Sequence, residues 1–188
     1  YAGLVREAGA GDTAAMERLL MRAQEAAWRF SMSVCGRAGD AEDAMQEALI
    51  RTYRYAARIR EPEAFRPWLY RTVRNACLMG RRKKTGEPSR LQSIDDLLRE
   101  TDAASRGGVR HPGKDPEQLA GNAGLHRRLV KALRTLPAPY RVIVFMREME
   151  GLSTREVATV LGISEDNVKA RLHRARLALQ KSLAEVRS

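Results

Sequence analysis

Apolar residues along the chain recur at intervals of three and four, the spacing of amphipathic α-helices, and no long stretch alternates strictly at two. The pattern therefore predicts helices and no sheet. The expected helices cover Thr13–Gly36, Asp40–Arg58, Glu63–Arg82, Leu125–Leu136, Tyr140–Met149, Thr154–Leu161 and Glu165–Val186. Asp12 or Thr13 can cap the first helix, and Asp40 can accept from the free amides that open the second.

Residues 91–122 interrupt the helical pattern. Their second half, 105–122, is rich in Gly, Pro, Asn and Ser, which argue against continuous regular structure. The 188 residues then divide into two parts of fewer than 100 residues each. We expect an all-α fold with small helical domains at 1–90 and 123–188, joined by a flexible linker at 91–122. The second domain should hold four helices.

Charge follows the same division. The formal net charge is +11, from 34 Lys and Arg against 23 Asp and Glu. Basic side chains outnumber acidic ones by 17 to 11 in residues 1–90 and by 13 to 6 in 123–188, whereas 91–122 hold 4 basic and 6 acidic residues. Two basic blocks that flank an acidic connector are suited to binding nucleic acid.

Several classes of protein are disfavoured. The longest aliphatic or aromatic run is the five residues 142–146, too short for a membrane span, and residues 1–30 resemble no secretory signal. Cys35 and Cys77 are too few for a structural zinc site, and we expect free thiols, with redox sensing as the alternative. No HExxH, GxxxxGK[ST] or GxSxG motif occurs. The sequence predicts no catalytic residue, no cofactor, no metal and no membrane insertion.

The carboxy-terminal block has the parts of a helix-turn-helix. Ser153 and Glu156 have capping-box spacing, Gly162 can end the helix, and Ser164 can cap the next one. In that next helix an apolar stripe leaves a largely polar and basic outer face: the stripe is Val168, Leu172, Ala175 and Leu179, and the outer face includes Lys169, Ala170, His173 and Arg174. Such a face can enter a DNA major groove. The alternative is an ordinary helical hairpin with a solvated basic face.

The amino-terminal block contains two segments of interest. In the helix at 40–56, one side is mostly apolar and the other mixed and polar: Asp43, Gln46, Glu47, Ile50 and Arg54 share the second side. In 63–84, aromatic residues interleave with arginines, a combination that can stack on unpaired bases and follow a phosphate backbone. The alternatives are a solvated face for the first segment and core packing for the apolar residues of the second, which are Phe65, Trp68, Leu69, Val73 and Leu78. We expect Trp68 and Leu69 in particular to lie in the core.

Three motifs in order resemble the extracytoplasmic-function (ECF) group of bacterial sigma factors. They are DAEDAMQE at 40–47, FRPWLYRTVRN at 65–75, and the run from LRTLPAPYR to RARLAL at 133–179. The resemblance covers nearly the whole chain except the connector. It implies a promoter-specificity subunit without catalysis of its own, whose domains are similar to sigma regions 2 and 4. The partners implied are core RNA polymerase, promoter DNA and an anti-sigma factor, in the bacterial cytoplasm.

The resemblance also implies roles for individual residues. The clamp helices of the largest polymerase subunit would bind Asp43, Gln46, Glu47, Ile50 and Arg54, and the β flap would be a second polymerase contact. The single-stranded −10 element would bind Phe65, Arg71, Arg74, Asn75, Arg81, Arg82 and Lys83. The duplex −35 element would bind Lys169, Ala170, Arg171, His173, Arg174 and Arg176. Lys169 stands where relatives often have Arg. Of these two side chains, only Arg can make a forked pair of hydrogen bonds with guanine.

Two other functions remain open on the residues alone. An autonomous helix-turn-helix regulator would use residues 1–122 for sensing or dimerisation and would bind duplex DNA tightly without polymerase. A small nucleic-acid-processing enzyme would use the basic surface as a groove, but no metal-ligand cluster is evident in the sequence.

Overall fold

The structure of the chain, a computed structural model, describes residues 1–35, 37–85, 131–133 and 135–185, with their side chains except at 81–85, 184 and 185. Helices and turns make up these ranges, and no strand occurs in them. The helices are α1 (Ala2–Gly9), α2 (Thr13–Cys35), α3 (Ala38–Tyr55), α4 (Phe65–Thr85), α7 (Ala138–Val144), α8 (Thr154–Leu161) and α9 (Glu165–Glu185). The all-α prediction is confirmed.

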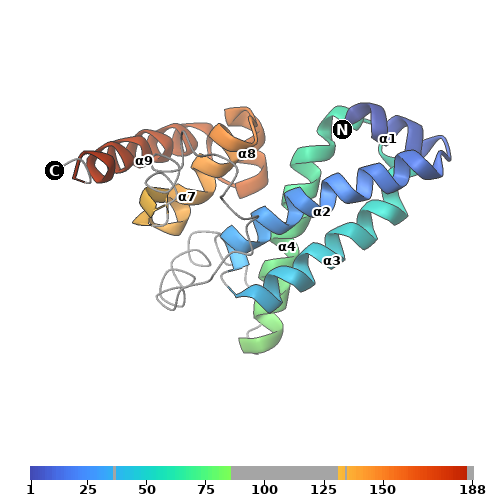
Figure 1. Ribbon diagram of the computed structural model, residues 1–188, viewed down its shortest axis with the longest axis horizontal. Coiled ribbons are helices and arrows are strands. Elements are labelled where there is room, and N and C mark those ends of the chain that lie inside the picture. Colours follow the sequence, from blue (N-terminus) through green and yellow to red (C-terminus); the bar gives the residue numbers. More distant parts are fainter. Residues whose placement is uncertain (36, 86–130, 134, 186–188) are drawn as a thin grey trace, which may run out of the picture.

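Helices α1 to α4 form one bundle (Figure 1). Alanines such as Ala23, Ala27, Ala44 and Ala48 are buried, and their small side chains let α2 and α3 approach closely. The Asp12 cap on α2 is confirmed, because the amide of Ala15 donates to Asp12 Oδ1 at 2.9 Å.

Two boundaries differ from the prediction. Helix α3 begins at Ala38, so Asp40 lies inside its first turn. Helix α1 was not predicted: it is short, and it is held by Val5 and Ala8, which pack into the core. Isolated helices of this length are marginal, so tertiary packing rather than local sequence stabilises α1.

The 3₁₀ turns η1 (Ala56–Arg58) and η2 (Pro62–Ala64) connect α3 to α4. Pro62 at the start of η2 has a fixed φ that suits the first position of a helical turn, where no amide donor is needed. This short connection brings α4 back along α3, so that the two helices pack side by side.

The carboxy-terminal helices form the predicted helix-turn-helix. The capping box is present: Glu156 N donates to Ser153 Oγ at 3.2 Å, and Ser153 N donates to Glu156 Oε2 at 2.7 Å. Gly162 ends α8 with a φ of 67°, a conformation that glycine adopts without a steric penalty, and Ser164 Oγ accepts from Asn167 N at 3.2 Å. Helix α9 follows at once.

The linker expected at 91–122 lies wholly outside the described residues. The helix expected at 125–136 lies largely outside them, although 131–133 are helical. Helix α7 continues into the π-helical turn η4 (Phe145–Met149). These elements pack on the amino-terminal bundle, α7 against α2 and α8 against α4 (Figure 1). Buried residues of both parts belong to one apolar cluster.

The cysteines depart from the prediction. Cys35, at the end of α2, and Cys77, in α4, form a disulfide with a Cα–Cα distance of 5.4 Å, so the expectation of free thiols is wrong. That expectation rested on the rarity of disulfides in cytosolic proteins, which carries no information about distance. The packing of α2 against α4 brings the two residues together.

Candidate nucleic-acid interface

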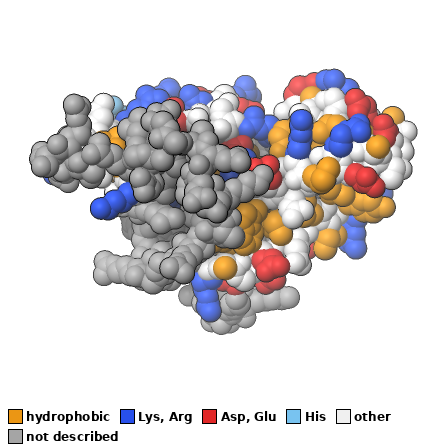
Figure 2. Space-filling view, in the orientation of Figure 1, with side chains coloured by type: hydrophobic (Ala, Val, Ile, Leu, Met, Phe, Trp, Pro, Cys, Tyr) orange, Lys and Arg blue, Asp and Glu red, His pale blue; other side chains and the backbone are white. Residues whose placement is uncertain are grey.

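One side of α3 carries the residues assigned to a polymerase contact. Asp43 and Gln46 are exposed, and Ile50 is 47% exposed although it is apolar. Glu47 is half-buried, and its carboxylate accepts from Arg51 Nε at 2.6 Å. In the face drawn in Figure 2, hydrophobic and charged side chains lie next to one another over the amino-terminal bundle. The structure therefore presents the predicted residues together on a surface of mixed character.

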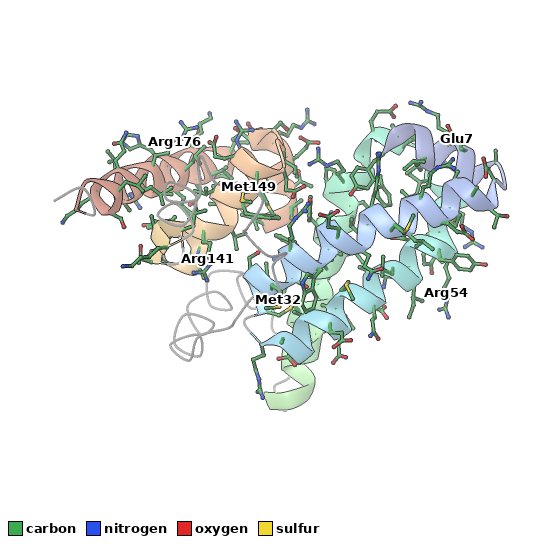
Figure 3. The ribbon with its side chains drawn as sticks, in the orientation of Figure 1. Glu7, Met32, Arg54, Arg141, Met149 and Arg176 are labelled. Atoms are coloured by element: carbon green, nitrogen blue, oxygen red, sulfur yellow. A yellow bond between two sulfur atoms is a disulfide. The ribbon has the colours of Figure 1, made fainter. Side chains whose placement is uncertain are left out.

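A groove runs between α3 and α4, on the side of α3 where Arg54 extends away from α2 (Figure 3). Its volume is about 760 Å³. It is lined by Glu47, Ile50, Arg51, Arg54, Tyr55, Arg58, Ile59, Arg60, Glu61, Ala64, Trp68 and Thr72. The groove thus begins at the α3 surface described above and ends on α4.

The groove combines positive charge with aromatic rings. Four arginines line it, against two glutamates. Tyr55 is 46% exposed, and the guanidinium carbon of Arg58 lies 5.7 Å from the centre of its ring. Trp68 is half-buried on the opposite wall. Sequence reasoning missed Tyr55, Arg58 and Arg60, although the crowding of aromatic and basic residues between 53 and 70 was a signal for them.

Phe65 does not have the position expected of a base contact. Its side chain is fully buried, with its ring centre 5.8 Å from that of Trp68 and 5.4 Å from that of Tyr1. A base cannot reach the Phe65 ring in this structure, so its assignment to the −10 contact is corrected. The Phe65 ring packs against the ring of Trp68 instead. Leu69 is buried as expected, whereas Trp68 is only half-buried.

The other predicted −10 residues of α4 fall into three groups. Arg71 is exposed, and Asn75 is half-buried with its Oδ1 3.5 Å from Arg74 Nη1. Arg74 faces α8: its Nη2 lies 3.6 Å from the position that a Cβ on Gly162 would occupy. Burial, with a smaller contribution from Arg71, lowers the pKa of the Arg74 guanidinium. Arg81, Arg82 and Lys83 belong to α4, and their side chains lie outside the described residues.

Helix α9 presents the predicted outer face. Val168, Leu172 and Ala175 are buried, while the opposite side exposes Lys169, Ala170, His173, Arg174 and Arg176. Arg171 is half-buried.

Arg176 extends from α9 on the side away from α7 (Figure 3), and its Nη2 lies 2.6 Å from Glu148 Oε1. Lys169 Nζ lies 3.1 Å from Asp166 Oδ1, one turn earlier in α9. Both pairs are exposed, so a phosphate can replace either carboxylate at low cost.

The described ranges contain neither a candidate metal cluster nor a helix suited to a membrane. Within them, no group of three or more His, Cys, Asp or Glu residues is placed to hold a metal ion. None of the helices that can be described is both long enough and apolar enough to cross a membrane.

Comparison with known proteins assigns the amino-terminal and the carboxy-terminal helices each to a known family. The family model for Sigma-70 region 2 matches residues 19–87, and that for Sigma-70 region 4 matches residues 126–179. The ECF RNA polymerase sigma factor SigL of Mycobacterium tuberculosis is 34% identical, over 97% of this chain and 96% of its own length. The chain belongs to the ECF sigma factors of RNA polymerase.

Other relatives of this sigma factor agree. SigE of Mycolicibacterium smegmatis is 33% identical over 93% of the chain, which spans 65% of that relative's length. The sigma-E factor of Escherichia coli is 29% identical over 96% of the chain and 92% of the relative. This membership favours a sigma factor over the stand-alone helix-turn-helix regulator.

Solved structures share the fold of this sigma factor. The sigma factor RpoE from Bartonella quintana, in complex with the anti-sigma factor NepR, matches with a TM-score of 0.61 at 23% identity, over 89% of this chain and 96% of that one. CnrH, in complex with the cytosolic domain of CnrY, matches with a TM-score of 0.56 at 21% identity, over 98% and 97%. The prediction of a two-domain, all-α sigma factor is confirmed.

Proposed function

We propose that this sigma factor binds core RNA polymerase through α3, captures the unpaired −10 strand in the groove between α3 and α4, and reads the −35 duplex with α9. The observation that carries the proposal is the groove, because it places four guanidinium groups and two accessible aromatic rings beside the α3 surface. The protein would act by binding alone, with the chemistry left to the polymerase.

The proposed polymerase surface consists of Asp43, Gln46, Glu47, Ile50 and Arg54. Polar groups surround one exposed apolar side chain, Ile50, a composition typical of the centre and rim of a protein–protein interface. The partner inferred from the family resemblance is the pair of clamp helices of the largest subunit, with the β flap as a second contact for the carboxy-terminal helices.

The −10 strand would lie along the groove. Aromatic rings stack on bases of any sequence, worth about 1–3 kcal/mol per base, and guanidinium groups neutralise the phosphates. Tyr55 and Trp68 would stack, whereas Arg58 and Arg60 would bind phosphates. Asn75 would contact the edge of an unstacked base. Arg71, Arg74, Arg81, Arg82 and Lys83 would extend the contact with the backbone along α4.

The −35 element would be read as duplex DNA by the exposed side of α9. Lys169, Ala170, His173 and Arg174 lie on successive turns of that side, as needed for a helix in the major groove. Arg171 and Arg176 would contact phosphates. Because Lys169 offers a single charged amine and no planar fork, we expect the guanine preference at its position to be weak.

An anti-sigma factor would be a further partner. Two solved structures with this fold are complexes: the sigma factor RpoE with the anti-sigma factor NepR, and CnrH with the cytosolic domain of CnrY. The proposed site of action is the bacterial cytoplasm, on the nucleoid when active and held by the anti-sigma factor when inactive. Stable one-to-one copurification with such a protein tests this partnership, and a chain recovered only free or with polymerase contradicts it.

Asp43→Ala is expected to weaken binding to core polymerase by about tenfold or more, since it removes a charged group from the proposed interface. Fluorescence anisotropy with purified core enzyme measures the affinity. Glu17→Ala, which removes an exposed carboxylate from α2, is the matched control and should leave the affinity unchanged. If Asp43→Ala and Glu17→Ala bind core polymerase with equal affinity, the proposed polymerase surface on α3 is contradicted.

Tyr55→Ala is expected to bind core normally but to weaken capture of the −10 strand by about 5- to 150-fold, the equivalent of one lost stacking contact. Run-off transcription on duplex promoters and binding of the holoenzyme to single-stranded −10 oligonucleotides measure the effect. If Tyr55→Ala initiates transcription as efficiently as Glu17→Ala, the groove is not the site that captures the −10 strand. If the wild-type chain binds duplex tightly without polymerase and supports no initiation, the chain is a stand-alone regulator.

A further inference from the structure

Helix α1 packs on the connection between α3 and α4 as well as on α2. It contacts both 3₁₀ turns of that connection, η1 and η2, at the end of the bundle where α3 ends and α4 begins (Figure 1). The family model for region 2 begins at residue 19, so α1 lies outside the matched residues. None of the residues proposed to bind polymerase or promoter DNA belongs to α1. The contacts between α1 and the connection therefore need an explanation of their own.

The connection forms one end of the groove proposed to hold the −10 strand. Five of its residues line that groove: Arg58, Ile59, Arg60, Glu61 and Ala64. Its backbone hydrogen bonds are local, because Ile59 N donates to Ala56 O at 3.2 Å and Ala64 N donates to Glu61 O at 2.9 Å. Neither bond fixes one turn relative to the other. The placement of these groove residues then depends on the surface against which the two turns pack.

Two contacts join α1 to the turns. The guanidinium group of Arg6 pairs with the carboxylate of Glu63, which lies in η2. At Gly9 the backbones of α1 and η1 lie close together, because a Cβ on Gly9 would be 3.6 Å from Ala56 O and 3.6 Å from Ala57 Cα. Helix α1 is thus held against η2 by an ion pair and against η1 by close backbone packing.

A row of aromatic rings extends from α1 to the α4 wall of the groove. The ring centre of Tyr1, the N-cap of α1, lies 5.4 Å from that of Phe65, and the Phe65 ring centre lies 5.8 Å from that of Trp68. Tyr1 Oη donates to the backbone carbonyl of Arg22 at 2.9 Å, which ties the row to α2. Burial raises the pKa of the Tyr1 hydroxyl, so the hydroxyl remains a donor. The Trp68 wall thus contacts the α1 cap through one intervening ring.

Resting on the proposed function, we propose that α1 is a positioning element for the −10 groove, and that Arg6 is the positioning residue that aligns η2. The side chains of Arg6 and Glu63 are 61% and 67% exposed, so their pairing adds little to the free energy of unfolding. The pair instead raises the fraction of chains in which the connection already has its strand-binding arrangement. The apparent affinity for the strand is proportional to that fraction. Loss of the pair should therefore weaken strand capture without weakening binding to core polymerase.

The test compares Arg6→Gln with Glu63→Gln in the holoenzyme. Both substitutions remove the ion pair, but Arg6→Gln lowers the net charge by one and Glu63→Gln raises it by one. Positioning predicts that both variants bind a single-stranded −10 oligonucleotide about two- to fivefold more weakly. Charge alone predicts tighter binding by Glu63→Gln, because added positive charge attracts the phosphates. Binding by Glu63→Gln that is as tight as that of the wild-type chain, or tighter, would overturn the proposal.

Hydrogen exchange of the free chain, followed by mass spectrometry, gives a readout that needs neither polymerase nor DNA. Both variants should exchange faster at residues 56–64, with unchanged rates in α3 and α4. Arg22→Gln is the matched control, because it removes the same positive charge from an exposed position of α2. Exchange in Arg6→Gln as slow as in this control would also overturn the proposal. Affinity for core polymerase should be unchanged in all three variants.

A second kind of variant leaves the ion pair intact. Gly9→Ile adds carbons that crowd the η1 backbone, whereas Gly3→Ile, in the same helix, has only the flexible side chain of Glu7 nearby, at 3.9 Å. Gly9→Ile alone should speed exchange at 56–64 and weaken strand binding, with unchanged helical circular dichroism. Identical behaviour of these two variants would contradict the role of α1. If the wild-type holoenzyme does not bind the strand, the proposed function fails, and exchange still shows separately whether α1 holds the connection.

Discussion

Phe30→Ala is expected to lower the free energy of unfolding by about 3–5 kcal/mol, the usual cost of emptying a large aromatic site in a packed core. Phe30 is fully buried in α2 and contacts Tyr70 and Phe145. The lost ring leaves a cavity that these rigid neighbours cannot fill. Because Phe145 belongs to the carboxy-terminal helices, the substitution should also weaken the contact between the two parts.

Urea denaturation followed by circular dichroism at 222 nm measures this change through the midpoint and slope of the transition. Met21→Ala is the matched control, since Met21 lies in the same helix and is 65% exposed. Exposed substitutions usually change stability by less than about 0.5 kcal/mol. A cost for Phe30→Ala no larger than that of the control would contradict the buried aromatic cluster.

Reduction of the Cys35–Cys77 disulfide is expected to lower the free energy of unfolding by about 2–4 kcal/mol. The bond joins residues 42 apart in sequence, so it restricts the unfolded chain substantially. Both cysteines are 5% exposed and lie between α2 and α4, where reduction removes the link without opening a surface. The folded helices should therefore keep their arrangement while the unfolded state gains freedom.

Urea midpoints with and without a phosphine reductant measure the effect, with the mass of the protein confirming reduction. The double variant Cys35→Ala and Cys77→Ala is the control, and its midpoint should not respond to the reductant. An unchanged midpoint for the fully reduced wild-type chain would contradict a stabilising bond between the two helices.

Local signals predicted the carboxy-terminal helices well. Ser153, Glu156, Gly162 and Ser164 act on backbone groups within four residues of themselves, so their spacing alone locates α8, the turn and the start of α9. The outer face of α9 follows from helical periodicity. For the same reason, the mixed side of α3 could be predicted, because it needs only one helix and its period.

Features that depend on packing between helices could not be predicted. Phe65 shares an aromatic and basic motif with Trp68, and only the fold shows that the Phe65 ring is fully buried while the Trp68 ring is half-buried. Cys35 and Cys77 meet because α2 packs on α4. Glu150 reads in sequence as one more surface carboxylate, whereas three side chains from distant positions surround it.

Helix α3 borders both the proposed polymerase surface and the groove, since Glu47, Ile50 and Arg54 belong to each. Its 18 residues span about 27 Å, the length of one short helix of a partner. An inhibitor of that size, laid along α3, would block recruitment of the polymerase and entry of the DNA strand together. On the proposed assignment, one contact about as long as α3 would therefore suffice to block both functions, and its release would restore both together.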